Sequence, residues 1–188
     1  MVKIDGTQDG DTTVTYDKGG WVFWMLLRQM GRKQALDGLR IFIHEYQDGP
    51  DFPVLQDFIA VMRRFASDKA AYDAFVKQWF FEVVVPEYRL SDAARNPSGE
   101  KDAWDVAVHV ENAGAGKMTV DVAAATGERF DSDGKANPDY KDARTAVELG
   151  AGEGKDVKIR CPFKPDRVLM DPDAFVLQLR RKLAVARF

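Results

Sequence analysis

The chain has 188 residues, with 27 basic and 30 acidic side chains and a formal net charge of −3. A composition of 45% hydrophobic and 30% charged residues is that of a packed globular protein rather than a disordered one. This charge balance gives no support for binding nucleic acid or anionic membranes through bulk electrostatics. The single cysteine, Cys161, excludes an internal disulfide framework and a cysteine-based zinc cluster.

The first residues are polar and acidic, and no apolar run approaches the roughly 20 residues that span a bilayer. We therefore expect a soluble domain with no secretory leader and no direct membrane insertion. The sequence does not indicate a cellular compartment. A membrane tether would have to lie outside this chain.

A helical period begins at Tyr16, after an extended or irregular segment over residues 1–15. The stretch GGWVFWMLLRQM is apolar all round, which predicts a central helix enclosed by its neighbours. Thr15 fits the N-cap position, and Asp17 would lie in the first turn, where a negative charge suits the helix dipole. Gly31 is the expected stop.

Three further helices are predicted, at about 32–48, at 54–66 and after Ser67, which fits an N-cap. Apolar residues three and four positions apart predict their buried faces. These residues are Leu36, Leu39, Ile43 and Tyr46; Leu55, Phe58, Met62 and Phe65; and Tyr72, Phe75, Val76 and Trp79. Short, closely linked helices of this kind are typical of antiparallel bundles or helical arrays.

The period changes to two near residues 83–86. WDVAVHVEN places Trp104, Val106, Val108 and Val110 on one face, and short strands are also predicted at 118–124, 143–149, 155–161 and 166–171. The closing segment, 172–188, fits either a strand or a short helix. The predicted fold is α+β, with an antiparallel helical segment over residues 1–83 and an immunoglobulin- or fibronectin-like β-sandwich over residues 84–188.

Several motifs are too weak to indicate a site. HEYQD, from His44 to Asp48, lacks the second histidine of the H-E-x-x-H zinc signature, so a solvated helix end is favoured. The other histidine, His109, falls on a predicted strand, and no histidine-rich site is expected.

Two glycine-containing loops and the cysteine are interpreted structurally. GAGEGKD is one residue short of a phosphate loop and has Asp156 where Ser or Thr is needed, so a hairpin loop is favoured. Residues 131–139 have the composition of a calcium loop without its register and are expected to form a solvated loop. Cys161 is predicted to be a small buried hydrophobe.

Tyr16 is the candidate functional residue. A tyrosine at a helix start is usually a half-buried packing residue. Gly19 and Gly20 follow it, however, and each glycine in a helix costs about 1 kcal/mol relative to alanine. The pair suggests that something packs against the backbone there, beside a cleft into which the Tyr16 hydroxyl could donate a hydrogen bond.

The segment VTYDKGGWVFWMLLRQMG resembles the Tyr-x-Lys-Gly segment that opens a central helix in the zinc aminopeptidases related to aminopeptidase N and leukotriene hydrolase. GLRIFIHEY and VLQDFIAVMRRFA look like the helices that follow. AFVKQWFFEVVVPEYRL looks like the family's tryptophan-containing helix running to the start of a strand, and the β-rich remainder is similar to the sandwich domain. The resemblance implies that Tyr16 is catalytic and donates its hydroxyl to the tetrahedral intermediate, opposite a zinc ion. It assigns no chemistry to Lys18.

The family's H-E-x-x-H helix, its distant glutamate ligand and its G-x-M-E-N strand would precede Tyr16, and these residues contain none of them. The resemblance therefore implies the C-terminal portion of such a gluzincin peptidase, inactive alone and holding no metal or cofactor itself. Its partners would be the remainder of the catalytic domain and, in the full-length zinc enzyme, a peptide substrate. The alternative is a non-catalytic protein-interaction or accessory module.

Overall fold

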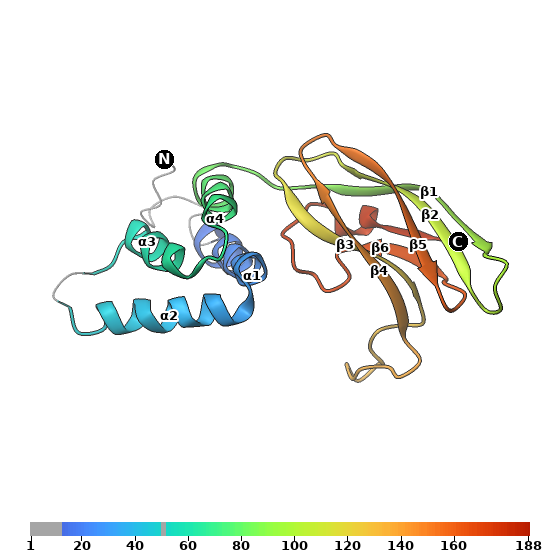
Figure 1. Cartoon of the computed structure of the whole chain (residues 1–188), viewed down its shortest axis with the longest axis horizontal. Coiled ribbons are helices and arrows are strands. Elements are labelled where there is room, and N and C mark those ends of the chain that lie inside the picture. The colour runs from blue at the N-terminus through green and yellow to red at the C-terminus, as the bar shows by residue number, and fades with distance from the viewer. Residues whose placement is uncertain (1–12, 50–51) are drawn as a thin grey trace. The chain divides into compact units, whose positions relative to one another are not determined.

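The computed structural model describes residues 13–49 and 52–188 and shows a mixed α+β protein (Figure 1). The chain divides into two compact units that meet between Val84 and Val85. We call the first the helical unit and the second the strand unit, and each is described by itself.

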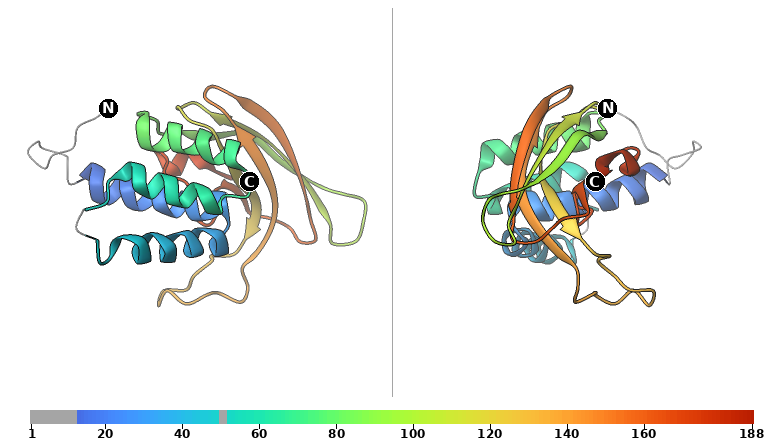
Figure 2. Two further views of the ribbon diagram at one scale, coloured as in Figure 1. Left: turned by 60° about the vertical axis from the view of Figure 1, so that its left-hand side comes forward. Right: turned by 90° about the vertical axis from the view of Figure 1, so that its right-hand side faces the viewer.

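The helical unit contains α1 (Gly19–Met30), α2 (Arg32–Tyr46), α3 (Leu55–Phe65) and α4 (Lys69–Val76). A π-helical segment, η1 (Thr13–Lys18), precedes α1, and a second, η2 (Lys77–Phe81), continues α4. The helices lie side by side in this unit (Figure 2). The extents of α2, α3 and α4 are close to the predicted ones, and α1 stops at Gly31 as predicted. Of the extended or irregular segment predicted for residues 1–15, residues 1–12 lie outside the described residues and residues 13–15 are helical instead.

Side-chain contacts show that α2 and α3 run antiparallel. Gly38 of α2 lies against Met62 and Phe65, late in α3, whereas Phe42, one turn further along α2, contacts Phe58, early in α3. The predicted antiparallel arrangement is therefore present for this pair.

The buried face of α2 differs from the predicted stripe. Ala35 and Gly38 are its buried residues, whereas Ile43 is 58% exposed. A Cβ atom at Gly38 would lie 2.8 Å from the Met62 sulfur, so α3 packs directly on the α2 backbone. The contact is set by the smallest side chains of the helix, which a count of large apolar residues does not reveal.

The predicted all-round enclosure of α1 is wrong. Only one face of α1 is buried, by Val22, Met25, Leu26 and Met30, and Trp24 is 45% exposed. In the described part of the chain, no helix is both long enough and apolar enough to cross a membrane.

Two predicted helix caps are also wrong. Thr15 and Asp17 lie inside η1, which runs directly into α1, so neither stands at a helix start. Asp68, rather than Ser67, caps α4, because its carboxylate accepts the Ala71 N–H at 2.9 Å. The core of the last helix is as predicted: Tyr72, Phe75, Val76 and Trp79 are all buried.

The strand unit contains two antiparallel sheets, with strand orders β1-β2-β5 and β4-β3-β6-β7. The strands are β1 (Tyr88–Pro97), β2 (Trp104–Asn112), β3 (Met118–Thr126), β4 (Lys141–Leu149), β5 (Gly154–Cys161), β6 (Arg167–Met170) and β7 (Val185–Arg187). On β2 the predicted alternation is present, because Val106, Val108 and Val110 are all buried.

Three features of the strand unit differ from the predictions or add to them. β1 is a full strand with an irregular register between Ser91 and Ala94, where the sequence indicated only a strand start. β4 and β5 belong to different sheets, so the 150–153 connection is a crossover and not the predicted hairpin. The closing segment holds both predicted alternatives, a short 3-10 helix, η3 (Arg181–Ala184), followed by β7.

We expect Gly38→Val to lower the free energy of unfolding by about 1–3 kcal/mol, because added side-chain atoms would push α3 away from the α2 backbone. Urea denaturation measures the effect. Arg40→Val is the control, since it adds the same β-branched side chain at an exposed position of α2 and removes only a surface ion pair with Asp37. Equal losses in both variants would contradict the close packing at Gly38.

Candidate functional site

Tyr16 lies in η1, one turn before α1, and its side chain is 75% exposed. A Cβ atom at Gly19 or at Gly20 would meet no atom within 4 Å. Within the described chain nothing packs against this backbone, so the expected neighbour of the glycine pair is not supplied by these residues. Lys18 Nζ donates a hydrogen bond to the Glu82 carbonyl at 3.4 Å, which links the start of α1 to the end of η2.

A cluster of five aromatic rings lies on the same helix ends. The Phe58 ring is at its centre, with centroid distances of 6.4 Å to Phe23, 5.4 Å to Phe42 and 6.4 Å to Phe80. The Tyr46 ring extends it, 5.1 Å from Phe42. All five side chains are only half-buried, so the cluster is part core and part surface.

The cluster marks the place where four helix ends meet: the start of α1, the end of α2, the start of α3 and the end of η2. The same ends carry exposed apolar side chains, namely Tyr16, Val54, Leu55, Phe81 and Val83. We call this surface, with the aromatic cluster and the two glycines, the apolar end of the helical unit. Gathered apolar exposure of this kind marks interaction sites in soluble proteins.

The structure brings no metal-ligating group together in its described residues. His44 is exposed near the end of α2, and His109 Nδ1 lies 2.7 Å from Asp156 Oδ1 on β5. Over residues 13–49 and 52–188, no three His, Cys, Asp or Glu side chains gather as a metal ion would require. These residues do not fit the zinc ion of the resembled family, and the absence of bound metal stays a prediction.

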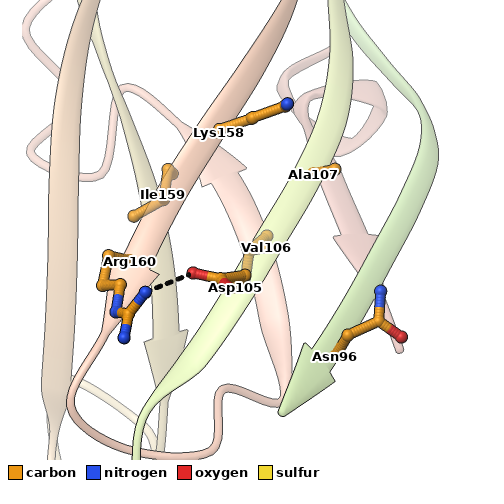
Figure 3. Close-up of a pocket in the computed structure, with 7 residues that line it drawn as sticks. All are labelled: Asn96, Asp105, Val106, Ala107, Lys158, Ile159 and Arg160. Carbon is orange, nitrogen blue, oxygen red and sulfur yellow. Dashed lines mark hydrogen bonds and ion pairs between the residues drawn. The ribbon is translucent and has the colours of Figure 1, made fainter. Parts of the chain in front are cut away.

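A shallow hollow lies on the sheet of β1, β2 and β5 (Figure 3). Its lining residues are Asn96, Asp105, Val106, Ala107, Lys158, Ile159 and Arg160. The Arg160 guanidinium is neutralised by Asp105 at 3.3 Å and Glu100 at 2.8 Å. The lining has no histidine, cysteine or hydroxyl side chain, so it offers no nucleophile with a base beside it.

The remaining sequence candidates have structural roles. Cys161 is fully buried, as predicted, and burial raises the pKa of its thiol. Lys155 Nζ donates to the Glu148 carbonyl at 2.7 Å and pairs with Glu153 at 2.9 Å, which leaves no phosphate cradle. The 131–139 loop extends away from the sheets and is exposed over most of its length (Figure 2).

No family model and no curated protein matches the sequence. Among solved structures, the crystal structure of Legionella pneumophila aminopeptidase A in complex with aspartic acid matches with a TM-score of 0.51 and 16% sequence identity. The match covers 89% of this chain, more than either unit could supply, and 18% of the length of that chain. The chain therefore shares a fold, through both of its units, with a part of an aminopeptidase.

Two further likenesses are weaker and cover little more than half of this chain. The CARDB domain of PF1109 from Pyrococcus furiosus matches with a TM-score of 0.38 at 18% identity, covering 56% of this chain and 94% of that one. DesR, a β-glucosidase from Streptomyces venezuelae, matches with a TM-score of 0.34 at 17% identity, covering 55% of this chain and 15% of that one. Scores this low carry no argument about function.

We expect isothermal titration of the purified chain with zinc to show no tight one-to-one binding, because the described residues offer no ligand set. A His44→Ala, His109→Ala double variant is the control, and its titration should match that of the parent chain. Stoichiometric binding that the double variant loses would overturn the prediction.

Proposed function

We propose that this chain is the C-terminal portion of a zinc aminopeptidase of the aminopeptidase N and leukotriene hydrolase kind. Its helical unit would be the tail of the catalytic domain. The zinc ligands would come from polypeptide other than the described residues, since these hold no ligand set. The chain alone would therefore hydrolyse no peptide, and its partner would be the remainder of that domain.

The observation that carries the proposal is the apolar end around Tyr16. Two consecutive glycines weaken a helix by about 1 kcal/mol each relative to alanine. The described residues do not compensate for this loss, because a Cβ at either position would meet none of their atoms within 4 Å. A neighbouring segment packed on the bare backbone accounts for both the glycines and the exposed apolar side chains beside them.

The fold likeness supports the same reading. A single match to aminopeptidase A runs through both units, and this chain corresponds to 18% of that protein's length. A coverage of 18% agrees with a catalytic domain of which this chain supplies only the C-terminal part and other polypeptide supplies the rest. The likeness to aminopeptidase A concerns the fold alone, and the peptidase activity is proposed.

Tyr16 has the chemistry that the proposal needs. Its hydroxyl is a neutral donor, and its 75% exposure leaves it free to meet a group outside the helical unit. Placed beside a scissile bond, the O–H would donate to the carbonyl oxygen as negative charge develops on it. A donor used only in the transition state lowers the barrier without tightening substrate binding.

We also propose that the strand unit is a sandwich of the immunoglobulin or fibronectin type. Two antiparallel sheets that share the unit and alternate buried with exposed residues along β2 and β5 support this. Such a unit would act as a scaffold beside the catalytic domain.

A non-catalytic interaction module is the second candidate. The exposed apolar side chains of the apolar end favour it, because this surface would then bind a separate protein. The two candidates differ in what a longer polypeptide can do, because only the first gives an active peptidase.

The decisive experiment extends the coding sequence upstream in frame and assays the longer polypeptide with aminoacyl 4-nitroanilides. We expect hydrolysis by the longer polypeptide and none by the 188-residue chain. Tyr16→Phe in the longer polypeptide should lower kcat by roughly 10²–10³ with little change in KM. Tyr140→Phe, which removes a hydroxyl bonded to Asp142 in the strand unit, is the matched control. An inactive longer polypeptide would reject the peptidase. An active one in which Tyr16→Phe lowers kcat less than twofold would reject the catalytic role of Tyr16.

Gly20→Ala should raise the free energy of unfolding of the 188-residue chain by roughly 0.5–1 kcal/mol, because helix propensity improves and no atom obstructs the new methyl group. In the longer polypeptide the same substitution should lower both stability and activity, since a neighbour would now meet the methyl. Gln34→Ala, exposed in the first turn of α2, should have the same small effect in both proteins. An equal gain from Gly20→Ala in both would show that nothing packs on this backbone.

A further inference from the structure

The connection between the two units is short. Within the helical unit, the Glu82 carbonyl accepts a hydrogen bond from Lys18, and the strand unit begins three residues later, at Val85. Consecutive Cα atoms are 3.8 Å apart, so these two residues stay within about 11 Å of each other. We call residues 85–87 the tether segment, because they connect the helical unit to β1.

The turn between β2 and β3 forms hydrogen bonds with the tether segment. The Ala113 N–H donates to the Glu87 carbonyl at 2.9 Å, and the Ala115 N–H donates to the Val85 carbonyl at 3.1 Å. The Glu87 N–H donates in turn to Oδ1 of the buried Asn112 at 3.1 Å. Backbone and side chain together fix both ends of the segment.

Gly114 shows how close this approach is. A Cβ atom there would lie 2.5 Å from the Val85 carbonyl oxygen and 2.5 Å from the Glu87 nitrogen. Both are backbone atoms and have no flexible end to move aside. The tether segment therefore runs directly over the bare backbone of the turn.

A second segment, residues 171–180, also contacts the tether segment. We call it the strap. The Leu179 N–H donates to the Pro86 carbonyl at 2.8 Å. The Glu87 carboxylate is buried and receives Nε of Arg180 and Nε of Arg89, each at 2.8 Å. A buried carboxylate held by two guanidinium groups is a strong, charge-assisted contact.

The strap is itself held in an unusual backbone conformation. Asp171, Ala174 and Arg180 have positive φ angles of 51°, 53° and 43°. The buried Asp171 carboxylate fixes the turn by accepting the N–H groups of Phe175 at 2.7 Å and Val176 at 2.9 Å. Non-glycine residues keep such angles only where surrounding contacts over-determine them.

We propose that the strap and the β2–β3 turn form a clamp on the tether segment. The clamp makes residues 85–87 a rigid part of the strand unit. It rests on contacts within the strand unit and does not depend on the proposed function.

Hydrogen exchange of the full chain, resolved by residue, tests the clamp with Arg180→Ala and Glu87→Gln. The amides to follow are those of Glu87, Ala113, Ala115 and Leu179. Each variant should speed their exchange at least about tenfold, because a charge-assisted bond closes the clamp. The buried strand amides of β2 and β3 should change by less than about threefold. Arg160→Ala, which removes surface pairs with Asp105 and Glu100, should leave all four amides unchanged.

Backbone ¹⁵N relaxation of the parent chain gives the second measurement. The tether-segment amides of Val85 and Glu87 should tumble with the β2 amides, and Arg180→Ala should make them more mobile. The proposal is overturned if they are already mobile in the parent chain or if neither variant changes their exchange. Uniform acceleration across both sheets in both variants would also overturn it, because the contacts would then belong to global stability rather than to a local clamp.

Discussion

The helical unit depends on the contact of four helix ends at Phe58. This ring touches Phe23, Phe42 and Phe80, so it ties α1, α2 and η2 to the start of α3. The helices are short, and most of their stability comes from such packing rather than from helix propensity. Because the rings are only half-buried, the contact that joins the four helix ends is also partly exposed apolar surface.

The aromatic cluster thus serves both as a packing contact and as exposed surface, which connects the fold to the proposed function. A unit that buried Phe58 and Tyr46 completely would present a polar end and need no neighbour. Here the half-buried rings, the open backbone at Gly20 and the exposed Tyr16 occur on one end. The proposed catalytic domain, completed by other polypeptide, would account for this arrangement, and so would a separate protein bound at the same end.

In the strand unit, a buried ionic contact holds the segment that leads into β1. Glu87 is buried between Arg89 and Arg180, and these arginines hold the pKa of its carboxyl below the usual range, Arg180 most strongly. The charged form is therefore the stable one. An ionic contact with such specific geometry fixes direction better than apolar packing, which tolerates sliding.

The sequence by itself determined the helix and strand periods, the change near residue 84 and the burial of Trp79 and Val108, because these follow from local spacing of apolar residues. It did not reveal that Gly38 is a core position, that Trp24 is exposed or that β4 and β5 belong to different sheets. Tyr16 could be singled out from its neighbours, but the aromatic cluster beside it could not, since Phe23 and Phe80 are 57 positions apart. Only the tertiary structure decides such features, because they depend on which distant residues meet, and the period of one element carries no information about the partner it packs against.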